Sequence, residues 1–303
     1  MRVTDRLIFS TATIETGRAR EAAEQAQEVV SRGTRIQHPS DDPAASGMII
    51  AFNMSSDRFA AISSAAAAAS DELSATDNAL DGIGNALSRA RELAVQFSNS
   101  TYSQAQRAGG AEEVAGILGQ VVSNLNTRFG NRYVFGGTKD GAPPFDPTTD
   151  PTTGLVLGTY RGDDGVRDVE IAPGMLQQSN VLVGSMSTDS ADPNSVLKTV
   201  QALQAALQAN DPIAVQATLD GLDAGINQVS TTRSQVGASM NAFDTAISAA
   251  RTASGDDKVR ASKQGDVDLI ESSIQLQATQ TALQASLAAT AQSFKLSLLD
   301  YLR

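Results

Sequence analysis

The chain of 303 residues contains no cysteine, which excludes disulfides, thiolate metal ligands and cysteine nucleophiles. It has one histidine, His38, and therefore no pair of imidazoles for metal binding or proton transfer. Tryptophan is absent and aromatic residues make up only 4% of the chain. Alanine-rich helical bundles need few aromatics, because small side chains let helices approach closely. These absences favour a helical structural protein over an enzyme.

Proline is missing from two long stretches, residues 44–142 and 213–303. All nine prolines lie in the remaining segments, at Pro39, Pro43, Pro143, Pro144, Pro147, Pro151, Pro173, Pro193 and Pro212. Because proline breaks helix interiors, the two proline-free arms can form long helices. The arms flank an insert of different composition, rich in Pro, Gly and Asp.

Charge and hydropathy exclude two classes of partner. Lys and Arg number 23 against 34 Asp and Glu, a net charge of −11, which disfavours binding to nucleic acid phosphates. No polybasic patch for an anionic membrane and no apolar run of about 20 residues is present. The first 20 residues lack the apolar stretch of a cleaved signal peptide.

Apolar residues recur at alternating steps of three and four, which is the spacing of coiled coils. We expect a first helix over Thr4–Ser31, with a weak stripe at Ala19, Ala22, Ala26 and Val29 and an end at Gly33. A strong stripe follows at Leu73, Thr76, Leu80, Ile83, Leu87, Ala90, Ala94 and Phe97. After a break near 99–110, a helix over 111–126 carries Val114, Ile117, Leu118, Val121 and Leu125.

The second arm repeats this spacing. A helix is expected over Ser195–Gln208, and Asp211-Pro212 caps the next. The stripe then runs through Val215, Leu219, Leu222, Ile226, Val229, Arg233, Val236, Met240, Phe243, Ile247 and Ala250, with Arg233 as a polar position. Residues 254–257 permit a kink. The C-terminal helix carries the seam that we predict for assembly: Leu269, Leu276, Leu283, Leu287, Phe294, Leu298 and Tyr301. Val267, Ile270 and Ile274 lie on a second face, so this helix is expected to touch more than one neighbour.

The insert is predicted to be a small β element, from short β-like runs at Leu155–Tyr160, Val166–Ile171 and Val181–Val183. The fold class is therefore mainly α: a long, coiled-coil-like helical bundle built from the N- and C-terminal arms, with a small β insert. We expect five segments: an N-terminal helix and turn (1–43), the first arm (44–137), the β-rich insert (138–190), the second arm (191–255) and a C-terminal helix (256–303).

Residues that could carry chemistry are few. Asp41 and Asp42 could be read as a metal or acid/base pair, but Asp42 before Pro43 is more simply the cap of the next helix. Asp163-Asp164-Gly165 lacks the ligand spacing of an EF-hand, and the Gly136 to Lys139 run does not fit a phosphate-binding loop. We therefore predict no catalytic residue, no cofactor and no metal site.

Four motifs together resemble the bacterial flagellin family. These are SRGTRIQHPSDDPAAS (Ser31–Ser46), ARELAVQFSNST (Ala90–Thr101), LNTRFGNRYVFGGTK (Leu125–Lys139) and TTRSQVGASMNAFD (Thr231–Asp244). The third is similar to the members of the family that join the hook to the filament. The residues that carry the family motif are Arg35, Asn126, Thr127, Arg128, Phe135, Gly136, Gly137, Arg233, Gly237 and Asn241.

The resemblance implies a structural subunit of the flagellum, exported through the type III channel to the hook–filament junction outside the cell. Its implied partners are further copies of itself in a ring, the first hook-associated protein, flagellin and an export chaperone of the FlgN type. It implies that the terminal helices pair into an inner coiled-coil layer. Two alternatives remain: a filament subunit of the flagellin type, and a cytosolic coiled-coil binding module.

Overall fold

The computed structural model describes residues 2–36, 38–149, 156–186 and 195–301. Side chains are not described for residues 2–9, 146–149, 156–159, 185 and 293–301. The described residues form seven α-helices: α1 (Arg2–Arg32), α2 (Pro43–Phe97), α3 (Gln104–Leu125), α4 (Val196–Gln208), α5 (Pro212–Ala217), α6 (Leu219–Gly265) and α7 (Leu269–Tyr301). Three two-stranded sheets accompany them, which confirms a mainly α fold with a small β insert.

The chain divides into two compact units. Unit 1 comprises residues 1–57 and 253–303, and unit 2 comprises residues 58–252. The long helices α2 and α6 supply residues to both units. Unit 1 is therefore built from both ends of the chain, and unit 2 from the continuous segment between them.

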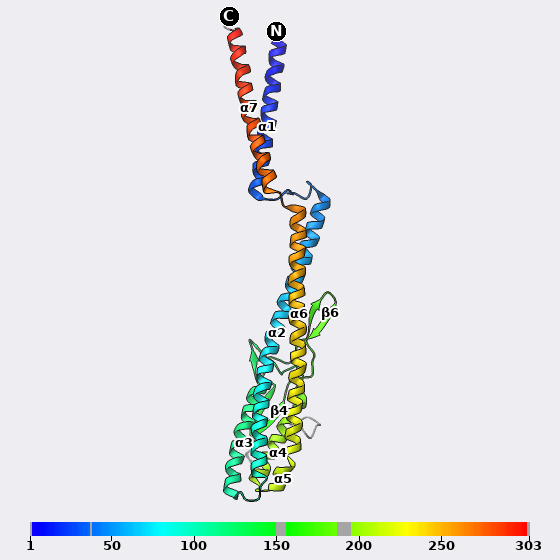
Figure 1. Cartoon of the computed structure of the whole chain (residues 1–303), viewed down its shortest axis with the longest axis vertical. Coiled ribbons are helices and arrows are strands. Elements are labelled where there is room, and N and C mark those ends of the chain that lie inside the picture. Colours follow the sequence, from blue (N-terminus) through cyan, green and yellow to red (C-terminus); the bar gives the residue numbers. More distant parts are fainter. Residues whose placement is uncertain (1, 37, 150–155, 187–194, 302–303) are drawn as a thin grey trace. The chain divides into compact units, whose positions relative to one another are not determined.

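In unit 1, α1 and α7 lie side by side (Figure 1). The less exposed side chains on each helix recur at steps of four and three, as in a coiled coil. On α1 they are Ala12, Thr16, Ala19, Ala23, Ala26 and Val30, and on α7 Ser272, Leu276, Thr279, Leu283, Ser286 and Thr290. The predicted stripe was wrong at Ala22, which is exposed. Ala23 is buried instead, and two adjacent alanines cannot be distinguished by hydropathy.

The turn after α1 pairs with the segment that joins α6 to α7. Gly33 has φ of 70°, and its amide donates to the carbonyl of Val29 at 2.9 Å. The Arg35 amide donates to the Gly265 carbonyl at 2.7 Å, and the Val267 amide donates to the Gly33 carbonyl at 3.2 Å. This short ladder closes unit 1 at the bases of α1 and α7.

Helix α6 runs without interruption through residues 254–257, where the sequence permits a kink, and ends at Gly265. Ser254 and Asp257 are buried. The Ser254 hydroxyl lies 2.9 Å from the Ser56 hydroxyl on α2. These lateral contacts support a helical backbone through a sequence that by itself suggests a turn.

Unit 2 is a bundle of helices (Figure 1) whose core matches the predicted stripes. Every predicted stripe residue of α2 and α3 is buried, from Leu73 to Phe97 and from Val114 to Leu125. Along α6, Leu222, Val229, Val236, Phe243 and Ala250 are buried as well. The coiled-coil spacing in these three helices is therefore confirmed as a core pattern.

Helix α3 begins earlier than the sequence indicated. Ser103 caps it: the Ser103 hydroxyl accepts the Gln106 amide at 3.4 Å, and the Ser103 amide donates to the Gln106 side-chain oxygen at 2.8 Å, a capping box. Gly110 lies inside the helix, and a Cβ there would come within 2.4 Å of the Phe97 ring. The glycine that suggested a break instead allows close packing of α2 on α3.

Arg107 joins the two turns beyond the ends of α2 and α4. Its guanidinium donates to the carbonyls of Phe97 (3.2 Å) and Asn99 (2.8 Å), and to the Asn210 side chain at 2.7 Å. The residue is only 4% exposed, so these bonds satisfy a charge within the bundle.

The strands form three antiparallel ribbons: β1 (Arg128–Phe129) with β2 (Arg132–Tyr133), β3 (Phe145–Thr149) with β4 (Val156–Tyr160), and β5 (Asp168–Ala172) with β6 (Met175–Gln178). The predicted strand at Val181–Val183 is wrong. Val183 is fully buried and precedes a 3-10 turn. The sequence did not predict β3, because the run from Asp146 to Gly154 is typical of turns. The strand contains Pro147, which a two-stranded ribbon tolerates on an open edge. Leu155, predicted to start a strand, lies outside the described residues.

Candidate assembly surfaces and polar anchors

Helix α7 is apolar on two sides. Leu276 and Leu283 are partly buried in unit 1, on the stripe that faces α1. Leu269, Ile270, Ile274 and Leu287 are 58, 74, 64 and 52% exposed. At 100° per residue, Ile270 and Ile274 lie opposite the stripe that faces α1. The side chains of Phe294, Leu298 and Tyr301, the remaining seam residues that we predicted, lie outside the described residues.

A groove of about 450 Å³ runs between α1 and α7. Leu283 and Leu287 line it from α7 together with Gln280. From α1 it is lined by Thr16, Arg20, Ala23, Glu24 and Gln27. Arg20 donates to Glu24 at 2.8 Å along the rim. The lining therefore combines apolar, uncharged polar and charged side chains.

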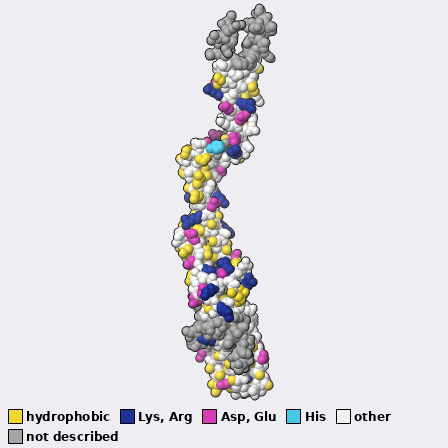
Figure 2. Space-filling view, turned by 180° about the vertical axis from the view of Figure 1, so that it is seen from behind, with side chains coloured by type: hydrophobic (Ala, Val, Ile, Leu, Met, Phe, Trp, Pro, Cys, Tyr) yellow, Lys and Arg dark blue, Asp and Glu magenta, His cyan; other side chains and the backbone are white. Residues whose placement is uncertain are grey.

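Hydrophobic side chains also gather on the surface close to the histidine (Figure 2). The first turns of α2 expose Met48, Ile50 and Met54 by 43, 55 and 69%. Methionine side chains adapt to different partners because they are unbranched and polarizable. Unit 1 therefore carries exposed apolar side chains on α2 as well as on α7.

The turn before α2 is organised by two aspartates. The Asp42 carboxylate accepts the Ala45 amide at 3.0 Å and the Arg35 guanidinium at 3.2 Å, and α2 begins at Pro43. The bond from Ala45, followed by that from Arg35, lowers the pKa of Asp42. Asp41 accepts the amide of the exposed His38 at 2.8 Å. Each carboxylate thus serves the backbone of the turn.

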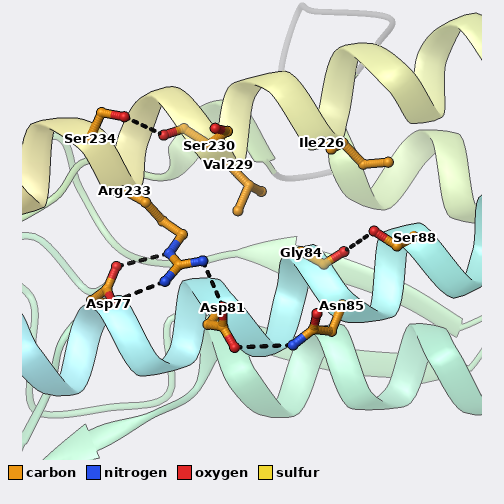
Figure 3. Close-up of a pocket in the computed structure, with 10 residues that line it drawn as sticks. All are labelled: Asp77, Asp81, Gly84, Asn85, Ser88, Ile226, Val229, Ser230, Arg233 and Ser234. Carbon is orange, nitrogen blue, oxygen red and sulfur yellow. Dashed lines mark hydrogen bonds and ion pairs between the residues drawn. The ribbon is translucent and has the colours of Figure 1, made fainter.

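Arg233, the polar position in the stripe of α6, binds two aspartates on α2 (Figure 3). Its Nε donates to Asp77 at 2.9 Å and its Nη1 donates to Asp81 at 2.6 Å. Hydrogen bonding to Asp77 is the main cause of the raised pKa of Arg233. The hollow around the guanidinium measures about 400 Å³ and is bordered by Gly84 and Ser88.

Sequence reasoning missed a second ionic centre at Glu72. Its side chain is 6% exposed and binds Arg167 closely, with Arg132 at 3.4 Å. Arg167 also reaches Asp140 at 3.3 Å. Glu72 on α2 directly precedes Leu73 of the predicted stripe, and its sequence position suggests an exposed charge. It is buried because the segment before β5 and the loop after β2 fold over it.

The remaining family-motif residues of the first arm hold the start of the insert. Asn126 bonds the backbone of Phe145 at 2.7 and 3.0 Å, and Phe135 is fully buried. Thr127 donates to the Asn124 carbonyl at 2.7 Å, and Arg128 lies over the Tyr133 ring.

Gly136 and Gly137 are required by backbone geometry. A Cβ on Gly136 would lie 2.6 Å from the Lys139 carbonyl oxygen. Gly137 has φ of 68°, and a Cβ there would lie 2.0 Å from the Asp163 carbonyl oxygen. In the second arm, by contrast, a Cβ on Gly237 would meet no atom within 4 Å, and Asn241 is exposed.

Two further properties concern membranes and metals. Within the described ranges, the helices fall short of the length and apolarity required to cross a membrane. The same residues contain no group of three or more His, Cys, Asp or Glu side chains that could hold a metal ion.

Known proteins share this organisation. The bacterial flagellin N-terminal helical region matches residues 8–140, and the bacterial flagellin C-terminal helical region matches residues 219–302. Flagellar hook-associated protein 3 of Salmonella typhimurium is 28% identical over 276 residues, 86% of each chain. The same protein of Escherichia coli is 28% identical over 298 residues, 89% of this chain and 90% of its own.

A solved structure shares the fold. The putative flagellar hook-associated protein from Vibrio parahaemolyticus superimposes with a TM-score of 0.63 at 23% identity, over 75% of this chain and 98% of its own. The two helical regions that match the family cover most of both arms and leave out most of the β insert. The chain therefore belongs to the bacterial flagellin family, whose members are structural proteins of the flagellum.

Proposed function

We propose that this chain is the adaptor subunit that joins the flagellar hook to the flagellin filament. The supporting observation is the second apolar face of α7, where Ile270 and Ile274 stay exposed although the helix is already paired with α1. A soluble monomer gains nothing from such a face, whereas a subunit can bury it against a neighbour. The relatives named hook-associated protein 3 support the junction in particular.

In this proposal, copies of the chain form a ring between the first hook-associated protein and flagellin. The terminal helices complete their burial only in that ring, so that ordering and binding are coupled. The seam comprises Leu269, Leu276, Leu283, Leu287, Phe294, Leu298 and Tyr301, as the heptads predict. Before assembly, the exposed face of α7 needs cover, which a chaperone of the FlgN type would supply, and export follows the type III route to the cell exterior.

Exchange of two exposed apolar residues of α7, one from the seam and one from the second face, tests the proposal. Leu287→Asp and Ile274→Asp place a charge on surfaces that are open in the isolated chain, so unit 2 should melt normally. Hooks in cells that carry either variant should lack attached filaments, as scored by electron microscopy. Ala282→Asp is the matched control, since Ala282 is exposed on α7 outside both apolar stripes. Normal filaments in both Leu287 and Ile274 variants would contradict the assigned surface.

A filament subunit is the second candidate, because the matched helical regions are named for flagellin itself. Copy number separates the two functions. Antibody labelling of sheared filaments should mark only their hook-proximal ends if the chain is the adaptor. Labelling along the whole filament would identify a filament subunit.

A further inference from the structure

We infer that Arg233 determines which of several heptad-related registers α2 and α6 adopt. This specificity role lies in unit 2 and does not depend on the proposed function. It follows from the direction of pairing, from the repetition of the apolar stripes and from the position of the three charges.

The contacts between α2 and α6 define an antiparallel pair. Asp223 near the start of α6 binds Arg91 at 2.5 Å, and Asp244 lies 3.5 Å from the Ser70 hydroxyl. Arg233 lies between these two contacts and binds Asp77. Residues later in α6 therefore contact residues earlier in α2, and all three contacts fit one register.

The apolar residues by themselves do not select that register. Both helices repeat apolar side chains at steps of three and four over several heptads, from Leu73 to Phe97 on α2 and from Leu222 to Ala250 on α6. A shift of seven residues places apolar positions opposite apolar positions again. Discrimination between such registers requires a position that differs from its heptad equivalents.

Arg233 is such a position, and its partners are specific as well. A shift by seven residues in either direction moves Arg233 away from both aspartates. The α2 positions that it would then face carry no charge: Ser70 and Ser74, or Gly84 and Ser88. In those registers the guanidinium loses the charge-assisted hydrogen bonds that it makes to Asp77 and Asp81 in the observed one. The observed register is the one that pairs all three charges.

Small residues around the ion pair make room for it. The hollow of about 400 Å³ is bordered by Gly84, Ser88, Ser230 and Ser234, and the Arg233 side chain extends across it from α6 toward α2 (Figure 3). The Arg233 side chain is 38% exposed and that of Asp77 33%. A half-exposed pair contributes little net stability, which leaves specificity as its principal effect.

Disulfide trapping tests the inference cleanly because the chain has no cysteine. The pair Ser70→Cys with Asp244→Cys reports the observed register. Ser70→Cys with Gly237→Cys, or with Arg251→Cys, reports a shift of seven residues in either direction. In the background with native Arg233, only the first pair should cross-link efficiently.

In an Arg233→Leu background, one or both shifted pairs should cross-link about tenfold more, which corresponds to about 1.4 kcal/mol of lost discrimination. The helical circular dichroism signal should be kept. Reversal of the charges, with Arg233→Asp, Asp77→Arg and Asp81→Arg together, should restore the single native cross-link. Arg233→Leu should not give the single native cross-link, although leucine suits the apolar stripe better than arginine does.

Cross-linking of the native pair alone in folded Arg233→Leu, at the yield found with native Arg233, would overturn the inference. If that variant loses its helical signal, the same reporters are read in Arg233→Gln, which is neutral and still polar. Cross-linking of the native pair alone in Arg233→Gln would also overturn the inference. Shifted cross-links in a folded charge-reversed variant would overturn it as well.

Discussion

The side-chain amide of Asn126 bonds both backbone polar groups of Phe145. Its Nδ2 donates to the Phe145 carbonyl at 2.7 Å, and its Oδ1 accepts the Phe145 amide at 3.0 Å. Asn126 is the C-cap of α3, and Phe145 begins β3 with its ring fully buried. One amide thus acts as a strand partner and fixes the point at which the β insert leaves the helical bundle.

Asn126→Ala should lower the free energy of unfolding of unit 2 by about 2 kcal/mol, because it removes two hydrogen bonds of about 1 kcal/mol each. Asn126→Asp should also destabilise, since a carboxylate cannot donate to the Phe145 carbonyl. Urea unfolding measures both. Asn241→Ala is the control: Asn241 also belongs to the family motif but is exposed, so its loss should change stability by less than about 0.5 kcal/mol. Equal effects at the two positions would refute the role given to Asn126.

The ionic centre at Glu72 predicts an asymmetry between buried and exposed arginines. Arg167→Ala leaves the Glu72 carboxylate, 6% exposed, without its nearest partner and should cost about 3–5 kcal/mol. Arg89→Ala removes an arginine that is 51% exposed and bound to Glu92 and Glu113. That change should cost at most about 1 kcal/mol. Chemical unfolding of the two variants compares them, and a loss near 1 kcal/mol for Arg167→Ala would show that Glu72 is well solvated.

Gly137 and Gly130 both have positive φ, at 68° and 60°, but differ in their surroundings. Gly130→Ala meets nothing within 4 Å and should cost only the backbone strain, about 1–2 kcal/mol. Gly137→Ala adds a clash with the Asp163 carbonyl at 2.0 Å, a backbone atom that cannot swing away. Its melting temperature should fall well below that of Gly130→Ala. Similar melting temperatures would mean that the 163–165 loop shifts freely.

The pKa of Asp163 is lowered by hydrogen bonds, chiefly from the Thr138 hydroxyl and then from the Thr138 amide. A folded pKa below the unfolded value of about 3.9 means that the ionised form stabilises the fold above that pH. This stabilisation is lost as the pH falls through the folded pKa. Thr138→Val should raise the pKa of Asp163 toward its ordinary value, as measured by NMR titration of its carboxyl carbon. An unchanged pKa would assign the shift to other groups.

The phase of the α1 stripe can be tested with two adjacent alanines. Ala23 is 8% exposed, so Ala23→Leu should overpack the α1–α7 contact and cost about 1–3 kcal/mol. Ala22→Leu adds the same atoms to an exposed position and should be nearly neutral. Hydrogen exchange of the α1 amides should accelerate only in the Ala23 variant. Faster hydrogen exchange in the Ala22 variant alone would show that Ala22, as hydropathy predicts, faces α7 in place of Ala23.

Local signals in the sequence predicted the helices because those signals act within a few residues. The stripe from Leu73 to Phe97 and the absence of proline placed α2, and Asp211 before Pro212 placed the start of α5, where Asp211 accepts two amides at 2.9 and 3.0 Å. Gly33 placed the end of α1 through its positive φ. Each of these signals depends on backbone geometry that neighbouring residues share.

Tertiary structure decided the features whose cause lies far along the chain. From the sequence, Gly110 suggests the end of a helix. In the structure it lies within α3, where the Phe97 ring packs against it. From the sequence, Glu72 suggests a surface charge. In the structure it is covered by Arg167, which lies 95 residues later in the chain.

The sequence by itself therefore determined that two heptad-bearing arms form helices with apolar faces. Only the tertiary structure decided which of two equivalent alanines faces α7 and which register joins α2 to α6. The physical reason is that a repeating apolar pattern specifies a face but not its partner. Unique contacts, such as that of Arg233 with Asp77 at 2.9 Å, distinguish one alignment from the next.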